Sequence, residues 1–167
     1  MNVLGDNSLP KVAHVEWLQP LMGSGYWIYD CVHFAGGRMI HGSSGGHSQI
    51  LEKISLLSNV EYIVISPCGF SIERTNEELN NIGILDTKEW QDLPAVKEGR
   101  VAICDGNKYF NRSSVASILG TTEMVAEIIH SELCSMVADG LDLMSWLPFV
   151  NDQELKTLRK MLNLPKV

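Results

Sequence analysis

The 167-residue sequence has no long apolar run, no CxxC pair and no cluster of lysine and arginine. Its apolar stretches are far shorter than the roughly 20 residues that a membrane-spanning helix needs, so no membrane span is predicted. The cysteines stand far apart, which predicts buried free thiols and no metal site built by the protein; they are Cys31, Cys68, Cys104 and Cys134. With a net charge of −7 and no basic stripe, the chain is not expected to bind nucleic acid.

The first residues also lack the basic and apolar segments of a secretory signal peptide. If the chain is complete, this predicts a cytoplasmic location. Apolar residues make up 45% of the sequence and charged residues 20%, which is typical of a soluble globular domain. The length suits one domain with its own hydrophobic core.

Strand and helix patterns alternate along the chain. Apolar runs of strand length predict buried strands over residues 12–18, 62–65 and 101–104. Helical spacing predicts helices over residues 26–35, 48–57 and 115–133, with another that Ser71 or Thr75 caps. This order predicts a mostly parallel sheet with helices on both faces. The expected fold class is α/β, a single three-layer α/β/α sandwich.

Two end segments differ from the central domain in composition. Residues 1–10 are polar and are predicted to form a flexible tail. The central α/β domain is expected over residues 11–133. Residues 134–167 are predicted to be a helical extension packed on the same domain.

Unusual residues gather where the strands end, in the turns of residues 17–20, 43–48, 67–70 and 107–112. Right-handed crossovers bring such turns to one edge of a parallel sheet, where open α/β sheets bind ligands. Together the turns predict an aromatic rim that suits a large flat ligand better than bond-breaking chemistry. No enzyme is predicted, because Cys68 is the one well-placed nucleophile and the sequence shows no base for it.

Three of these side chains each have alternative interpretations that stay open. Trp17, at a strand end, is either a platform for a ligand face or a core residue. His47, at the predicted start of the 48–57 helix, either ligates a metal centre, donates to a ligand or is an exposed residue near a helix cap. Arg112 either binds a ligand carboxylate, amide or phosphate, or braces its turn through backbone carbonyls.

Six segments of the chain occur in the same order in one known family. They are Val-Glu-Trp-Leu-Gln-Pro-Leu-Met (15–22), Phe-Ala-Gly-Gly (34–37), Gly-Gly-His-Ser (45–48), Ile-Ser-Pro-Cys-Gly-Phe (65–70), Leu-Pro-Ala-Val-Lys-Glu-Gly-Arg-Val (93–101) and Asp-Gly-Asn-Lys-Tyr-Phe-Asn-Arg (105–112). Over residues 11–133 the chain resembles the C-terminal lobe of ABC-transporter substrate-binding proteins of the cobalamin and iron-siderophore type. These are the class III periplasmic binding proteins, and the resemblance is strongest to the cobalamin-binding branch.

The resemblance implies a non-enzymatic lobe that binds a small molecule, either cobalamin or another tetrapyrrole or metal chelate. It also implies an ABC permease and an N-terminal lobe as partners, with Glu52, early in the helix after Gly-Gly-His-Ser, touching the transporter. The residues expected to face the cleft between the lobes are Trp17, His47, Phe70, Tyr109 and Phe110. Arg112 joins this predicted ligand-binding set because it lies at the same edge of the sheet.

A second hypothesis stays open beside the first. The resemblance covers one lobe only, and half a clasp buries less of a ligand than a closed cleft does. An exposed apolar rim favours a partner surface. The alternative is therefore a repurposed lobe that acts as an interaction or dimerisation module, for example a homodimer, without the original ligand.

Overall fold

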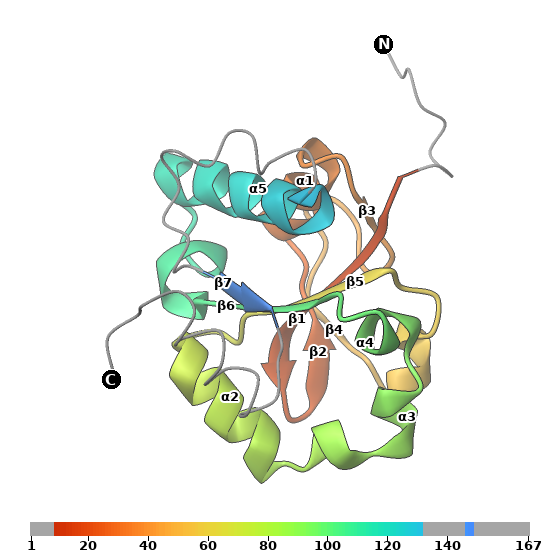
Figure 1. Cartoon of the computed structure of the whole chain (residues 1–167). Coiled ribbons are helices and arrows are strands. Elements are labelled where there is room, and N and C mark those ends of the chain that lie inside the picture. Colours follow the sequence, from red (N-terminus) through yellow and green to blue (C-terminus); the bar gives the residue numbers. More distant parts are fainter. Residues whose placement is uncertain (1–8, 132–145, 149–167) are drawn as a thin grey trace.

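The computed structural model describes residues 9–131 and the backbone of residues 146–148 (Figure 1). These residues form a seven-stranded sheet between two helical layers. The strands are β1 (Lys11–Leu18), β2 (Leu21–Gly23), β3 (Arg38–Met39), β4 (Gln49–Ile50), β5 (Tyr62–Ile65), β6 (Val101–Cys104) and β7 (Trp146–Pro148). The helices are α1 (Trp27–Phe34), α2 (Ile72–Asn81), α3 (Lys88–Gln91), α4 (Pro94–Lys97) and α5 (Val115–Ile129), with shorter helical turns at Ile54–Leu57, Ile84–Asp86 and Gly106–Phe110.

The centre of the sheet is parallel. β1 pairs in parallel with β5, and β5 pairs in parallel with β6. On its other side, β1 pairs in parallel with β3 at its start and antiparallel with β2 at its end. β4 and β7 add antiparallel strands at the two sides, in the order β4-β2-β1-β5-β6-β7. The predicted α/β class with a mostly parallel sheet is confirmed.

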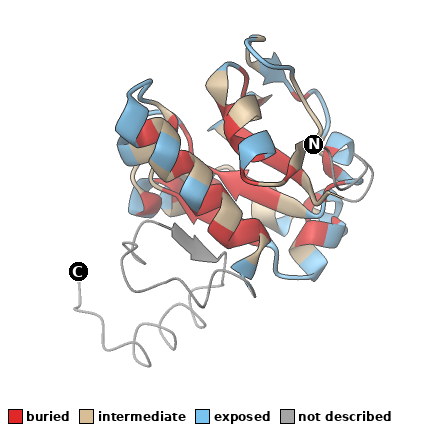
Figure 2. Ribbon diagram, turned by 90° about the horizontal axis from the view of Figure 1, so that it is seen from above, coloured by how far each residue is buried: buried red, intermediate tan, exposed pale blue. Residues whose placement is uncertain are grey.

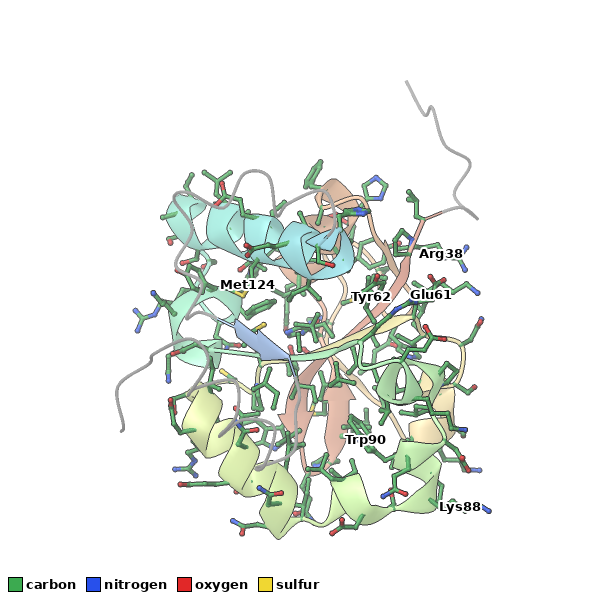
Figure 3. All side chains as sticks on the ribbon, viewed as in Figure 1. Arg38, Glu61, Tyr62, Lys88, Trp90 and Met124 are labelled. Carbon is green, nitrogen blue, oxygen red and sulfur yellow. The ribbon has the colours of Figure 1, made fainter. Side chains whose placement is uncertain are left out.

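Helices cover both faces of the sheet. Figure 1 shows α1 and α5 on one face and α2, α3 and α4 on the other. Alternate residues of the central strands enter the two cores, so Val12 packs with α1 and α5 while Ala13 packs on the opposite side. The strands are buried between the two layers, as Figure 2 shows. Trp90 fills the α2–α4 side and Met124 the α1–α5 side (Figure 3).

The strands predicted over residues 62–65 and 101–104 match β5 and β6, and the first predicted strand differs from β1 by one residue. The predicted helix over residues 48–57 is wrong. Gln49–Ile50 is instead a strand that pairs with β2, followed by the helical turn Ile54–Leu57. The apolar spacing reflects separate burial of Leu51 and Leu57, while Ile50 on the same predicted face is 59% exposed.

The predicted tail and extension fall largely outside the described residues. Of the tail over residues 1–10, the structure describes the last two. Of the predicted helical extension over residues 134–167, it describes Trp146–Pro148, which is a strand paired with β6 and not a helix. In the described part of the chain, no helix has the length and apolar character needed to cross a membrane.

Candidate functional site

A hollow of about 300 Å³ opens at the carboxyl edge of the central strands. Its walls come from the end of β1, the start of α1 and the turns that follow β5 and β6. This is the edge where open α/β sheets bind ligands. The lining of the hollow includes the side chains of Glu16, Tyr26, Trp27, Ser48, Cys68, Phe110 and Asn111.

A bulge at the end of β1 sets the first wall. The register with β2 shifts between Val15 and Trp17. As a result Val15 and Leu18, three residues apart, enter the same core. Glu16 and Trp17 lie between them and stay partly open to solvent, and Trp17 is 36% exposed.

Trp17 and Phe70 form an aromatic pair at this rim. Their ring centroids lie 5.5 Å apart and their planes are tilted by 59°. The Trp17 indole N–H donates to the Gln19 carbonyl at 3.0 Å, which fixes the ring. The guanidinium carbon of Arg74 lies 4.5 Å from the Phe70 ring centroid, a cation–π distance. Trp17 is thus a surface aromatic residue, so its interpretation as a core residue is wrong. Its interpretation as a platform for a ligand face stays a prediction.

Tyr26, which lines the hollow, forms a second pair with His47. The Tyr26 hydroxyl is joined to His47 Nδ1 by a hydrogen bond of 2.9 Å, and the two rings meet edge to face. His47 lies in the exposed loop before β4, so the predicted helix start at this residue is wrong. The backbone N–H of Tyr26 also donates to the Gly46 carbonyl at 2.6 Å, and this contact holds the loop against α1.

Tyr26 has a backbone conformation that is unusual for a residue with a side chain. Its φ is 54° and its ψ is −133°, a combination that glycine tolerates and other residues adopt at a cost. The crowding nearby is tight: a Cβ atom on Gly25 would lie 2.3 Å from the Gly46 carbonyl oxygen. A strained backbone conformation at Tyr26 therefore places a tyrosine ring at the mouth of the hollow.

The floor of the hollow is Phe110, which is only 2% exposed. Its ring stacks on the imidazole of His14. One face of the ring is used in core packing, and the residue still lines the hollow. Its predicted contact with a ligand stays a prediction.

His14 is buried beneath this floor. Its Nδ1 bonds to the Ser24 hydroxyl at 2.8 Å and its Nε2 to the Ser66 hydroxyl at 2.5 Å. Burial lowers the pKa of His14 to about 3, so the ring is neutral near pH 7. A neutral imidazole donates from one nitrogen and accepts at the other, which satisfies both serines.

The turn over residues 105–112 is shaped by local hydrogen bonds. Asp105 accepts from the backbone N–H groups of Asn107 and Lys108, at 2.8 and 3.0 Å. Gly106 packs so closely that a Cβ atom there would lie 2.1 Å from the Pro67 carbonyl oxygen. The Asn111 side chain donates to the Gly106 carbonyl. Asn111 is thereby held at the wall of the hollow.

Tyr109 and Arg112, from the same turn, do not line the hollow. The Tyr109 ring packs on α5, where a Cβ atom on Gly120 would lie 2.7 Å from it. The Arg112 Nε donates to the Asn107 carbonyl at 2.9 Å, which agrees with the bracing interpretation. Tyr109 therefore packs on α5 and not at the hollow, and its predicted place in a cleft between two lobes stays a prediction.

Glu52 and Cys68 are both exposed. Glu52 follows β4 in a loop, so its predicted place early in a helix is wrong. Cys68 lines the hollow, whereas Cys31 and Cys104 are buried, and burial raises the pKa of both of those thiols. No hydrogen bond joins Cys68 to a histidine within the described ranges. Within the same ranges, no three His, Cys, Asp or Glu residues are grouped as a metal site would require.

Sequence reasoning brought Trp17, Phe70 and the Gly-Gly-His-Ser loop to one edge, and the structure places them there. Sequence reasoning did not identify Glu16, Tyr26 or His14 as residues of the site. Glu16 is the one acidic residue of the strand predicted over residues 12–18, and this was the available signal for it. For Tyr26, the preceding Gly-Ser-Gly was a signal of unusual backbone, but no sequence rule marks the following tyrosine as strained.

Solved structures of substrate-binding proteins share this fold. One is an ABC-transporter substrate-binding protein from Listeria monocytogenes, with a TM-score of 0.60 and 19% identity over 73% of this chain and 48% of that one. Another is the molybdate-binding periplasmic protein MolA of Haemophilus influenzae, with a TM-score of 0.60 and 12% identity over 82% of this chain and 40% of that one. A third is the TroA-like periplasmic binding protein FepB of Veillonella parvula, with a TM-score of 0.56 and 16% identity over 74% and 40% of the two chains.

At these identities the likeness shows the fold alone. No family model and no curated protein matches the sequence. The chain spans less than half the length of these solved structures. The described residues thus have the fold of one part of a periplasmic binding protein, as the motifs predicted, while the cobalamin-binding branch stays a prediction.

Proposed function

We propose that this chain is a non-enzymatic binding lobe, and that its ligand is cobalamin or another tetrapyrrole or metal chelate. The observation that carries the proposal is the aromatic pair of exposed Trp17 and half-buried Phe70 beside the hollow at the carboxyl edge of the sheet. A partly exposed aromatic pair offers apolar area to a flat ligand. The solved structures that share the fold are binding proteins for ABC transport by their own descriptions, which supports a binding role.

The size of the hollow limits what it holds. Ligand sites in proteins commonly enclose about 300–1,000 Å³, so a hollow of about 300 Å³ takes only part of a macrocyclic ligand. The rest of such a ligand lies across the rim, against Trp17 and Phe70. A second wall is needed for tight binding, and a partner lobe or another copy of the chain supplies it under this proposal.

Visible absorption spectra test the proposal, with cyanocobalamin and haemin titrated separately into the purified chain. We expect a saturable spectral change with at least one of them in the micromolar range. Trp17→Ala weakens that binding about tenfold, because it removes the larger ring of the wall. Phe34→Ala is the matched control, because Phe34 is an aromatic residue of α1 that is more exposed than Trp17. We expect the Phe34→Ala variant to bind the same compound with unchanged affinity. No spectral change with either compound, well above micromolar concentration, would refute the proposal.

The alternative is an interaction module that uses the same edge. The observation in its favour is that apolar side chains remain open there: Tyr26 is 44% exposed, and Ile50 lies on the side strand β4. Light scattering at high protein concentration separates the two hypotheses. A dimer that Ile50→Asp converts to monomer supports the interaction module, and a strict monomer rules out its homodimer form.

A further inference from the structure

The hollow contains one formally charged side chain, and that side chain is acidic. Among the described residues that line it, Glu16 is the one acidic residue, and none is lysine, arginine or histidine. The Glu16 carboxylate makes no ion pair with any other described residue. It is therefore a carboxylate, partly withdrawn from solvent, that no cation among the described residues balances.

Aromatic rings stand beside this carboxylate. Tyr26 and Trp27 both line the hollow, and their ring centroids lie 6.3 Å apart. The faces of such rings carry negative electrostatic potential and attract cations, most strongly for tryptophan. A carboxylate and two aromatic rings around one small space form a typical environment for a positively charged ligand group.

The nearby cations of the protein are engaged outside the hollow. Arg74 lies over the Phe70 ring, and the Arg112 Nε donates to the Asn107 carbonyl. Neither residue lines the hollow. A ligand anion would meet the Glu16 carboxylate there, and a neutral group would leave that carboxylate desolvated without a partner.

From this arrangement we infer that the hollow selects a cationic group, an organic ammonium, on the ligand. The inference rests on the proposed function, because it assumes that the hollow is part of the ligand site. It adds a charge preference to that site: among the proposed ligands it favours a metal chelate that carries an ammonium group, which cyanocobalamin and haemin lack. Glu16 balances the ammonium, and Tyr26 and Trp27 contact its methylene or methyl groups. The Ser48 and Asn111 side chains supply polar contacts at the margin.

A pair of probes with equal shape and different charge tests the inference. Choline carries a quaternary nitrogen where 3,3-dimethylbutan-1-ol carries a neutral carbon. The affinity of each is measured by ligand-observed NMR on the whole chain. We expect choline to bind about tenfold more tightly than the alcohol. Glu16→Gln removes the preference, because it keeps the shape and hydrogen bonding of the side chain and deletes its charge.

Glu61→Gln is the matched control. Glu61 is an exposed carboxylate immediately before β5, at the far end of that strand from the hollow (Figure 3). Glu61→Gln changes the net charge of the chain by the same amount as Glu16→Gln does. We therefore expect the Glu61→Gln variant to keep the wild-type preference for choline. Circular dichroism confirms that both variants are folded.

Three results overturn the inference: equal binding of the two probes, binding of neither, or a choline preference that survives Glu16→Gln. Cyanocobalamin and haemin are titrated into the same preparations. These titrations distinguish a failure of the inferred charge preference from a failure of the proposed function. If either compound binds while the charge preference is absent, the binding site stands and the inference falls. If neither probes nor pigments bind, both fall.

Discussion

The imidazole ring of His14 lies nearly parallel to the ring of Phe110, with centroids 4.8 Å apart and an angle of 9° between the planes. His14 belongs to β1, and Phe110 ends the helical turn after β6. The two nitrogens of the same imidazole bond to Ser24, after β2, and to Ser66, after β5. One buried side chain thereby joins four segments that surround the hollow.

We expect His14→Ala to lower the free energy of unfolding by about 2–4 kcal/mol. The substitution leaves two buried serine hydroxyls without their partner and opens a space against the Phe110 ring. Urea unfolding followed by circular dichroism measures the change. His33→Ala, at an exposed position of α1, is the control and should cost less than about 0.5 kcal/mol. A His14→Ala cost below about 1 kcal/mol would argue against this role of the imidazole.

Stability should fall as the pH is lowered through the mild acid range. In the unfolded chain a histidine binds a proton near pH 6.5, whereas burial lowers the pKa of folded His14 to about 3. The folded state therefore binds fewer protons, so the contribution of His14 is complete above pH 6.5 and decreases towards pH 3, by about 1.4 kcal/mol per pH unit. Burial also lowers the pKa of His41, which acts in the same direction.

Urea unfolding between about pH 7.5 and pH 5.5 measures this dependence. His14→Gln is the comparison, because glutamine keeps two hydrogen-bonding groups and does not titrate. The variant should lose less stability over the interval than the wild type does. Equal losses in the two proteins would show that His14 is not kept neutral by burial.

Gly106→Ala should distort the site. The new Cβ atom would lie 2.1 Å from the Pro67 carbonyl oxygen, so the turns after β5 and β6 must separate. We expect a cost of about 1–3 kcal/mol in stability, together with weaker binding of whichever pigment the wild type binds. Gly23→Ala is the matched control, because its Cβ atom would make only ordinary contacts at 3.6 Å. Thermal unfolding and the visible titration provide the two readouts, and a Gly106→Ala variant as stable as Gly23→Ala contradicts the prediction.

Tyr26 offers a test of stored backbone strain. Glycine at this position adopts a φ of 54° without the cost that a side chain imposes, about 1–3 kcal/mol. Tyr26→Gly should therefore be more stable than Tyr26→Ala, although both lose the ring and the bond to His47. The difference in melting temperature between these two variants isolates the strain. Alanine equal to or better than glycine would mean that the backbone at Tyr26 is relaxed.

Much of the sheet could be predicted because its central strands are buried on both faces. Tyr62–Ile65 and Val101–Cys104 are continuous apolar runs, a pattern that surface strands and amphipathic helices do not give. Residues 48–57 misled the same reasoning. Ile50, Leu51 and Leu57 have helical spacing, yet pairing of Gln49–Ile50 with β2 decides the structure. That pairing depends on residues more than 25 positions away, which a local pattern does not contain.

The candidate site was predictable in part for a similar reason. Trp17 lies in the last two residues of β1 and Phe70 in the turn after β5, and parallel topology alone brings such strand ends together. The link from His14 to Ser66 spans 52 residues, so no local motif signals it. The family resemblance implies that Phe110 and Tyr109 face the cleft between two lobes. In the structure, the His14 ring and the α5 surface take most of their area.

The most direct test of the account is a map of backbone amide shifts by ¹H–¹⁵N NMR as cyanocobalamin is added. The account predicts shifts clustered at the carboxyl edge, in residues 16–18, 24–27, 66–70 and 105–111. Amides at the opposite edge, such as Glu61, which bonds to the Lys11 carbonyl, should not move. Shifts centred on that opposite edge, or a spectrum unchanged at saturating cyanocobalamin, would contradict a corrinoid-binding site at the hollow.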